Sequence, residues 1–271
     1  MNRTSSPIRA IPAILALLVF AGGTPAEVLA QREARDDEYA VNDVRVQHRS
    51  YVMEETGETI PYALFVPSGY DPSTPSPLMV SLHGAGRQFD WLMNYAGFLD
   101  LADQHGYVVV TPLGYTRRGG YGYRGDSEQD RRAEQDVMNV FEIVRTELNI
   151  DPDRMYLWGH SMGGAGTYHL AATHPDLWAA LGVAAPAPSV DPDQLEAFKH
   201  VPIIVMQGDE DRLVTTTREW VAKMKELGME HLYVEVKGGD HSRFINANAD
   251  TLEKIFAFFN IVRKDQRPRT N

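Results

Sequence analysis

The sequence of 271 residues contains no cysteine. This absence excludes disulfides and a lipidated cysteine anchor, so the fold relies on the packing of its core. A glycine-rich phosphate loop, a zinc-spaced set of His and Cys residues and an internal repeat are also missing, and no cofactor or metal ion is predicted. Basic residues are few, with 26 Lys and Arg against 37 Asp and Glu and a formal net charge of −11. This balance disfavours nucleic acids and anionic membranes as partners, because like charges repel.

Residues 1–30 have the pattern of a secretory signal peptide. Arg3 and Arg9 give a positive start, residues 11–21 are apolar, and residues 28–30 resemble a small-residue cleavage site. A retained amino-terminal anchor is the competing interpretation, although the apolar stretch is short for a membrane-spanning helix. The pattern predicts a protein that is secreted or periplasmic, without stable membrane association. Export without disulfides further suggests a bacterial source.

The chain after the signal peptide is long enough for one domain with a full-sized core. Residues 31–43 are polar and charged, and we expect them to form a flexible lead-in. Residues 44–263 are predicted to form the domain itself, followed by a frayed tail at 264–271.

Alternating strand and helix patterns predict a three-layer α/β/α sandwich. Strand patterns at residues 44–52 and 60–66 flank a turn signal and predict antiparallel amino-terminal strands. From residue 78 onward, strands alternate with helices, which is typical of a mainly parallel sheet. Helices are expected near residues 91–104, 134–148, 164–173, 215–227 and 248–259. Further strands are expected near residues 77–82, 108–111, 155–158, 181–184, 201–206 and 231–236.

A G-x-S-x-G motif, GHSMG at residues 159–163, follows a short apolar run and precedes a helix of small residues. This pattern is typical of a nucleophile elbow, a sharp strand-to-helix turn that exposes a serine hydroxyl. The glycines are needed because side chains at 159 and 163 would collide with the neighbouring strand and helix. The motif predicts Ser161 as a catalytic nucleophile.

A serine nucleophile needs a base and an orienting acid, which in this arrangement follow it in the order acid, then histidine. His241 is the one of nine histidines that falls in a loop after the last predicted strand, so it is the predicted base. Asp211 follows the penultimate strand, and the pattern G-x-x-D-x-x-V at residues 208–214 favours it as the acid. Asp209 is the main rival, although Asp is also typical of turns. Asp240 is adjacent to His241, and neighbouring side chains usually diverge.

Backbone amides are predicted to stabilise the oxyanion of a tetrahedral intermediate. The segment HGAG at residues 83–86 follows an early strand, and its glycines let the backbone approach a substrate. One donor is the amide of Met162, directly after the nucleophile. The other is assigned to Ala85, with Gly86 as the alternative donor and as a substrate contact.

Two segments do not fit the scaffold. Residues 114–125 mix glycine, tyrosine and arginine after a strand, at the sheet edge where ligands bind. One interpretation is a substrate-lining loop in which Tyr121 and Tyr123 contact an aryl or sugar group, and the other is a solvated surface loop. Residues 186–198 form either a small cap over the site or a plain connector.

These motifs resemble the α/β-hydrolase superfamily. The likeness is strongest to its secreted branch of feruloyl-esterase-like and polyhydroxybutyrate-depolymerase-like enzymes, beside the catalytic domain of the prolyl oligopeptidase family. The matching stretches are residues 65–70, 82–86, 151–157, 159–164, 208–211 and 240–241. The resemblance implies that residues 44–263 are an α/β-hydrolase catalytic domain. It does not specify a substrate, because the fold supports many reactions.

The predicted function is hydrolysis of short-chain acyl or aryl (feruloyl-like) esters, through a Ser-His-Asp triad and an acyl-enzyme. The substrate is a small molecule or a polymer-linked ester. One alternative is a compact serine peptidase of the prolyl oligopeptidase type, although those relatives usually add a second domain. The other is a non-catalytic binding domain on a hydrolase scaffold.

Overall fold

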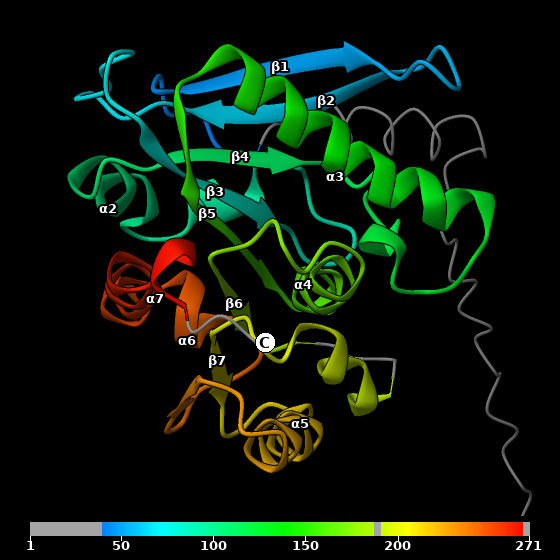
Figure 1. The fold of residues 1–271 in the computed structure, drawn as a ribbon, viewed down its shortest axis with the longest axis vertical. Helices are drawn as coiled ribbons and strands as arrows, with labels where there is room; N and C mark the ends of the chain where they lie inside the picture. Colours follow the sequence, from blue (N-terminus) through cyan, green and yellow to red (C-terminus); the bar gives the residue numbers. More distant parts are fainter. Residues whose placement is uncertain (1–39, 187–190, 268–271) are drawn as a thin grey trace, which may run out of the picture. The chain divides into compact units, whose positions relative to one another are not determined.

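The computed structural model describes residues 40–186 and 191–267 (Figure 1). The predicted signal peptide at 1–30, most of the lead-in at 31–43 and the end of the tail lie outside the described residues. In the described part of the chain, no helix is long and apolar enough to cross a membrane.

The described residues form an eight-stranded sheet in the order β1-β2-β4-β3-β5-β6-β7-β8. Its strands are β1 (Val46–Val52), β2 (Thr59–Phe65), β3 (Ser76–Leu82), β4 (Val108–Pro112), β5 (Ile150–His160), β6 (Ala180–Ala184), β7 (Ile203–Gly208) and β8 (His231–Val236). β2 pairs antiparallel with β1 and with β4, and the other neighbours are parallel. The predicted sheet, mainly parallel with antiparallel amino-terminal strands, is therefore confirmed.

The helices follow the predicted alternation. They are α2 (Phe98–Gln104), α3 (Glu128–Glu147), α4 (Met162–Thr173), α5 (Val214–Glu226), α6 (Arg243–Asn246) and α7 (Ala249–Ile261), with 3₁₀ turns η1 (Trp91–Asn94), η2 (Gly120–Gly122), η3 (Pro192–Phe198) and η4 (Lys264–Gln266).

Two helices differ from their predicted bounds. The helix expected at 91–104 is broken into η1 and α2, because Gly97 between them has φ +78°. α3 begins six residues earlier than expected, since the Ser127 side chain accepts a hydrogen bond from the Asp130 amide and caps it.

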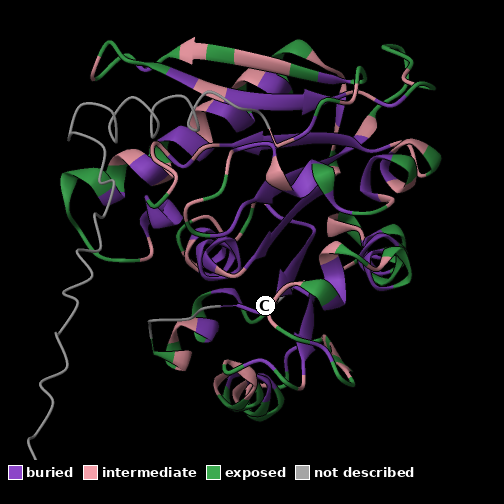
Figure 2. Cartoon of the chain, turned by 180° about the vertical axis from the view of Figure 1, so that it is seen from behind, coloured by how far each residue is buried: buried purple, intermediate pink, exposed green. Residues whose placement is uncertain are grey.

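Helices cover both faces of the sheet, which makes the three predicted layers (Figure 1). Successive residues of a strand face opposite sides. Val205 of β7 joins the core beneath α3, α4 and α5, whereas Ile204 and Met206 join the core beneath α2 and α7. Figure 2 shows the central strands buried and the outer surfaces of the helices exposed.

The parallel strands end at one edge of the sheet, and the predicted site residues lie in the loops at that edge. Ser161 directly follows β5, Asp211 follows β7 and His241 follows β8. The loops after β3 and β4, residues 83–90 and 113–119, leave the same edge because β3, β4 and β5 are parallel. Residues as far apart in the sequence as His83 and His241 are thereby brought to the same edge of the sheet.

Candidate active site

Ser161 occupies a strained turn between β5 and α4. Its backbone has φ 58° and ψ −114°, in a region that non-glycine residues rarely adopt. The turn needs glycine on both sides. A β-carbon on Gly163 would lie 1.9 Å from the Leu82 carbonyl oxygen, and one on Gly159 would lie 2.2 Å from the Gly163 carbonyl oxygen. These collisions are the ones that the sequence motif predicts.

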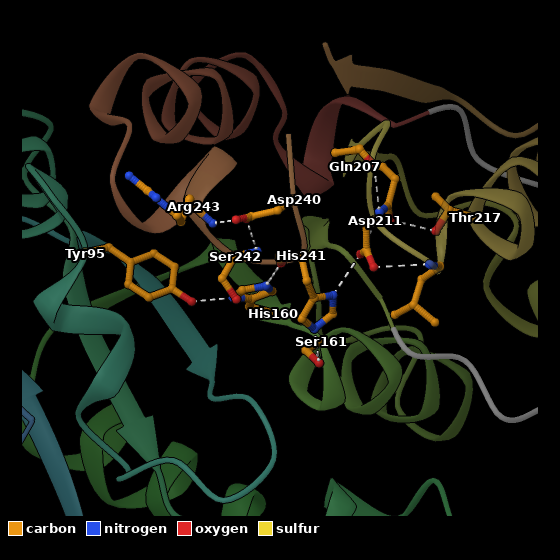
Figure 3. Close-up of polar contacts among 12 residues, drawn as sticks. Tyr95, His160, Ser161, Gln207, Asp211, Thr217, Asp240, His241, Ser242 and Arg243 are labelled. Carbon is orange, nitrogen blue, oxygen red and sulfur yellow. Dashed lines mark hydrogen bonds and ion pairs between the residues drawn. The ribbon is translucent and has the colours of Figure 1, made fainter. Parts of the chain in front are cut away.

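A chain of hydrogen bonds joins the three residues expected to form a triad (Figure 3). His241 Nδ1 lies 2.7 Å from Asp211 Oδ2, and His241 Nε2 lies 2.9 Å from Ser161 Oγ. An ionised carboxylate can only accept, so Nδ1 is the nitrogen that carries the proton. Nε2 is then free to accept the proton of the Ser161 hydroxyl.

Asp211 is held in place by donors other than His241. The Gln207 side chain donates to Asp211 Oδ2 at 2.8 Å, and the Leu213 amide donates to Oδ1 at 3.1 Å. Burial raises the pKa of Asp211, but the hydrogen bonds from His241, Gln207 and Leu213 outweigh it and bring the pKa below its ordinary value. Thr217 fixes the Gln207 amide by donating to its Oε1 at 2.8 Å. Gln207 and Thr217 were not predicted from the sequence.

The two other carboxylates considered as the acid have different partners. Asp209 Oδ1 accepts the Gly238 amide at 2.6 Å and so ties the loop after β7 to the loop after β8. Asp240 Oδ1 accepts the amides of Ser242 and Arg243 at 2.9 and 2.6 Å. Of these acids, the structure brings Asp211 to the imidazole of His241.

The loop after β3 lies against the nucleophile. A β-carbon on Gly84 would lie 3.7 Å from the Ser161 β-carbon. The Gly86 amide already donates to the Arg117 carbonyl at 2.6 Å, so it is not available to a substrate. Among the described residues, the Ala85 amide has no such acceptor, and the Met162 amide lies in the first turn of α4, where helical amides lack a partner. The alternative that Gly86 is the donor is therefore wrong in this structure.

Tyr121 does not line a substrate surface, contrary to the sequence prediction. The side chain is fully buried, and its hydroxyl donates to the His83 carbonyl at 3.2 Å. A β-carbon on Gly114 or on Gly166 would lie 2.6 Å from its ring, so the ring fills the space that these glycines leave. Tyr121 supports the loop after β3 from below. Tyr123 is half-buried and packs against the core, with the Arg124 guanidinium 5.5 Å above its ring.

The segment 114–125 is anchored by a buried carboxylate, which no sequence motif indicates. Asp136 of α3 accepts the Tyr115 amide at 2.9 Å and the Tyr51 hydroxyl at 2.8 Å. Burial raises the pKa of Asp136 to about 6, although these hydrogen bonds oppose the rise. The anchor joins the segment to α3 and to β1.

A second buried pair supports His241 from the side opposite Asp211. His160 Nε2 lies 2.8 Å from the His241 carbonyl oxygen, and His160 Nδ1 is hydrogen-bonded to the Tyr95 hydroxyl (Figure 3). Trp91 stacks on the His160 ring at 5.4 Å and 15°. Burial lowers the pKa of His160 to about 4, so the ring is neutral at neutral pH. Nε2 then donates to the carbonyl, and Nδ1 accepts from Tyr95.

Of the segment at 186–198, residues 187–190 lie outside the described residues. The described part contains η3, in which Leu195 and Phe198 are fully buried in the core shared with α4 and α5.

Comparison with known families agrees with this architecture. Residues 53–257 match the model of the family described as "Putative esterase". This match covers most of the chain, so the protein belongs to that family, and its fold is that of the α/β hydrolases. The resemblance inferred from the motifs is confirmed.

Individual relatives cover part of the chain. The bifunctional acetylxylan esterase/xylanase XynS20E of Neocallimastix patriciarum is 35% identical over 151 residues, which are 55% of this chain and 21% of that protein. Putative esterase NocK of Nocardia uniformis subsp. tsuyamanensis is 30% identical over 198 residues, which are 70% of this chain and 55% of that protein. The chain thus spans about a fifth of the length of the first relative and little more than half of the length of the second. A solved thermostable esterase superposes with a TM-score of 0.63 at 27% identity, covering 81% of this chain and 63% of that one.

Proposed function

We propose that this protein is a serine carboxylic-ester hydrolase. The observation that carries the proposal is the hydrogen-bond chain from Ser161 through His241 to the buried Asp211. Membership of an esterase family and the kinship with an acetylxylan esterase support hydrolysis of esters with short acyl groups.

The mechanism follows from the positions of the atoms. His241 Nε2 takes the hydroxyl proton as Ser161 Oγ attacks the ester carbonyl carbon. Negative charge moves to the carbonyl oxygen, where the amides of Ala85 and Met162 stabilise it. The tetrahedral intermediate collapses, the alkoxide leaves with the proton from His241, and an acyl-Ser161 ester remains.

The second half of the cycle repeats the first with water. His241 takes a proton from a water molecule, whose oxygen attacks the acyl carbonyl. Collapse then breaks the bond to Ser161 Oγ, which recovers its proton from His241, and the carboxylic acid is released. In both halves Asp211 keeps the proton-bearing Nδ1 oriented and stabilises the imidazolium.

The nucleophile is tested with the variant Ser161→Ala. We expect turnover of 4-nitrophenyl acetate to fall by a factor on the order of 10⁴ or more. Ser50→Ala, at an exposed position on the edge strand β1, is the matched control and should keep full turnover. An active Ser161→Ala protein, free of wild-type contamination, would contradict the serine mechanism.

Ester specificity is tested against the peptidase alternative. An amide needs protonation of a poor leaving group, whereas an activated ester leaves with little help. We expect kcat/KM for short-chain or aryl esters to exceed that for alanine or proline anilides by at least about a hundredfold. Comparable values would favour a compact peptidase, and the absence of any turnover would favour a binding domain.

We further propose that residues 1–30 direct export and are removed, leaving the lead-in 31–43, a catalytic domain at 44–263 and the tail 264–271. Support comes from the charge and apolar pattern of the sequence. The intact mass of protein recovered from periplasm or medium should correspond to a chain that begins at or near Gln31. Full-length protein in the membrane fraction would contradict this proposal.

A further inference from the structure

Two arginine side chains of the segment 114–125 flank the proposed oxyanion site. A β-carbon on Gly86 would lie 3.1 Å from Arg118 Nη2, so this guanidinium rests on the loop that carries the Ala85 amide. Arg124 Nη2 lies 3.7 Å from Met162 Sδ, on the residue that supplies the other amide. One guanidinium therefore lies against the loop that carries the Ala85 amide, and the other lies against the side chain of Met162.

Two glycines leave room in the backbone for these side chains. Gly86 and Gly120 both have positive φ, at +74° and +77°. A β-carbon on Gly120 would lie 3.0 Å from Arg124 Nε, as one on Gly86 would crowd Arg118. Arg124 Nη1 also donates to the Arg118 carbonyl at 2.7 Å, which fixes the two residues relative to each other.

Carboxylates do not neutralise this pair within the described residues. Neither Arg118 nor Arg124 has an ion-pair partner there, and both are exposed. Of the acids on α3 near this segment, Asp136 accepts the Tyr115 amide and Glu134 pairs with two histidines. The exposed Asp126, two positions after Arg124, forms no ion pair with it in the described part of the chain. Other arginines do form ion pairs: Arg45, Arg49, Arg132, Arg145, Arg218 and Arg263. In the described part of the chain Arg87, Arg131 and Arg267 form none, but each contacts a ring or a backbone carbonyl instead.

Exposed guanidinium groups without a carboxylate partner attract an anion. A protein with a net charge of −11 repels anionic molecules at long range, so an anionic substrate needs local positive charge at the site. The planar guanidinium matches a carboxylate in geometry and charge. Arg118 and Arg124 are two such guanidinium groups near the proposed oxyanion amides.

We infer that the preferred substrates are esters that carry a carboxylate a few bonds from the scissile carbonyl, and that Arg118 and Arg124 bind that carboxylate. This inference rests on the proposed esterase function. The carboxylate sits on the acyl or on the alcohol part of the ester, and the experiment separates these two sources.

The test compares anionic and neutral esters in matched pairs, with the enzyme-free rate subtracted. For the acyl side, 4-nitrophenyl hydrogen adipate is compared with 4-nitrophenyl hexanoate, which has the same leaving group and acyl length. For the alcohol side, 4-acetoxybenzoate is compared with its methyl ester. At low ionic strength we expect the kcat/KM ratio of anionic to neutral ester to exceed about ten in one pair, and to fall as salt is added.

The variants Arg118→Gln and Arg124→Gln assign the preference to these residues. Each should lower the ratio in the preferred pair by about tenfold, mainly through a higher KM for the anionic ester, since a charge-assisted hydrogen bond is lost. Arg145→Gln removes the same charge from an exposed position at the other end of α3 and should leave the ratio unchanged.

Three results would overturn the inference. They are a wild-type ratio at or below one in both pairs, an unchanged ratio in the double variant, and an equal loss on anionic and neutral esters. The last result would assign the arginines to stabilisation of the oxyanion. Each of these results leaves the esterase function intact, because the neutral ester is still hydrolysed. Wild-type protein that hydrolyses none of the four esters would overturn the proposed function and this inference together.

Discussion

Removal of the Tyr95 hydroxyl should slow turnover while leaving the surrounding packing in place. The variant Tyr95→Phe keeps the ring, which packs against Trp91 and Trp158 with centroids 5.0 and 6.2 Å away. It removes the hydrogen bond that Tyr95 donates to His160 Nδ1. His160 in turn holds the His241 carbonyl at 2.8 Å, so the variant loosens the backbone of the proposed base.

The size of the effect follows from burial. His160 is fully buried, and a buried acceptor that loses its donor costs about 1–3 kcal/mol. We expect the free energy of unfolding to fall by about that amount. Poorer orientation of His241 should also weaken stabilisation of the transition state. A loss of about 1.4 kcal/mol in that stabilisation lowers kcat about tenfold. KM should change little, because Tyr95 is only 4% exposed.

The acid limb of the activity profile should move as well. Burial holds the pKa of His160 at about 4, and the Tyr95 hydroxyl occupies the lone pair that a proton would take. Without the hydroxyl, Nδ1 can take a proton without losing a hydrogen bond, so we expect the pKa of His160 to rise although the ring stays buried. Activity should then decline at a higher pH than in the wild type on acidification.

The assay combines steady-state kinetics on 4-nitrophenyl acetate, from neutral to acidic pH, with urea unfolding. Tyr107→Phe is a matched control, because Tyr107 is a buried tyrosine that donates one hydrogen bond to Asn260 Oδ1 at 3.0 Å, at the opposite edge of the sheet. The control should lose similar stability but keep its kcat and its acid limb. Equal kinetic losses in both variants, or wild-type kinetics in Tyr95→Phe, would refute the support of His241 by this pair.

Three further predictions concern the acid, the acid stability and the elbow. Asp211→Asn should lower kcat by about 10⁴-fold. Asp209→Asn should lower kcat far less, because an asparagine side chain there still accepts the Gly238 amide. A larger loss of kcat in Asp209→Asn than in Asp211→Asn would move the acid assignment to Asp209. The neutral form of His160 is the native one, since its pKa is about 4 in the fold against an ordinary 6.5. Its contribution to stability, on the order of 3 kcal/mol, is present above pH 6.5 and lost as the pH falls toward 4. The free energy of unfolding, measured in urea, should therefore fall less on acidification in His160→Gln than in the wild type. Gly163→Ala should abolish activity or folding, because its β-carbon would lie 1.9 Å from the Leu82 carbonyl, whereas Gly69→Ala, with nothing within 4 Å, should be tolerated when both are followed by circular dichroism and turnover.

The features that could be predicted from the sequence are those that depend on short-range pattern. The elbow is specified by glycines two positions from Ser161, and the strands by apolar runs such as that of β7. Local spacing favours Asp211 over Asp209, and the contact of Asp211 with His241 agrees with that prediction.

The features that could not be predicted depend on which residues meet across the sheet edge. Tyr121 belongs to a glycine-rich loop that looks exposed in sequence, yet its ring fills the space left by Gly114 and Gly166. Tyr95 is 65 positions from His160, and no periodicity indicates that they pair. α3 begins early because Ser127 caps it, and this cap precedes the first apolar residues whose spacing would indicate a helix.

One chain of backbone contacts makes the proposed oxyanion site depend on the segment 114–125. Asp136 holds the amide of Tyr115, and two residues later the Arg117 carbonyl accepts the amide of Gly86 at 2.6 Å. That bond fixes the peptide adjoining Ala85, whose own amide is the proposed donor. The segment therefore sets the direction of the oxyanion donor with its backbone, while its Arg118 and Arg124 side chains lie beside it. A substitution that displaces this segment should consequently affect turnover and charge preference together, whereas the glutamine variants of the two arginines separate them.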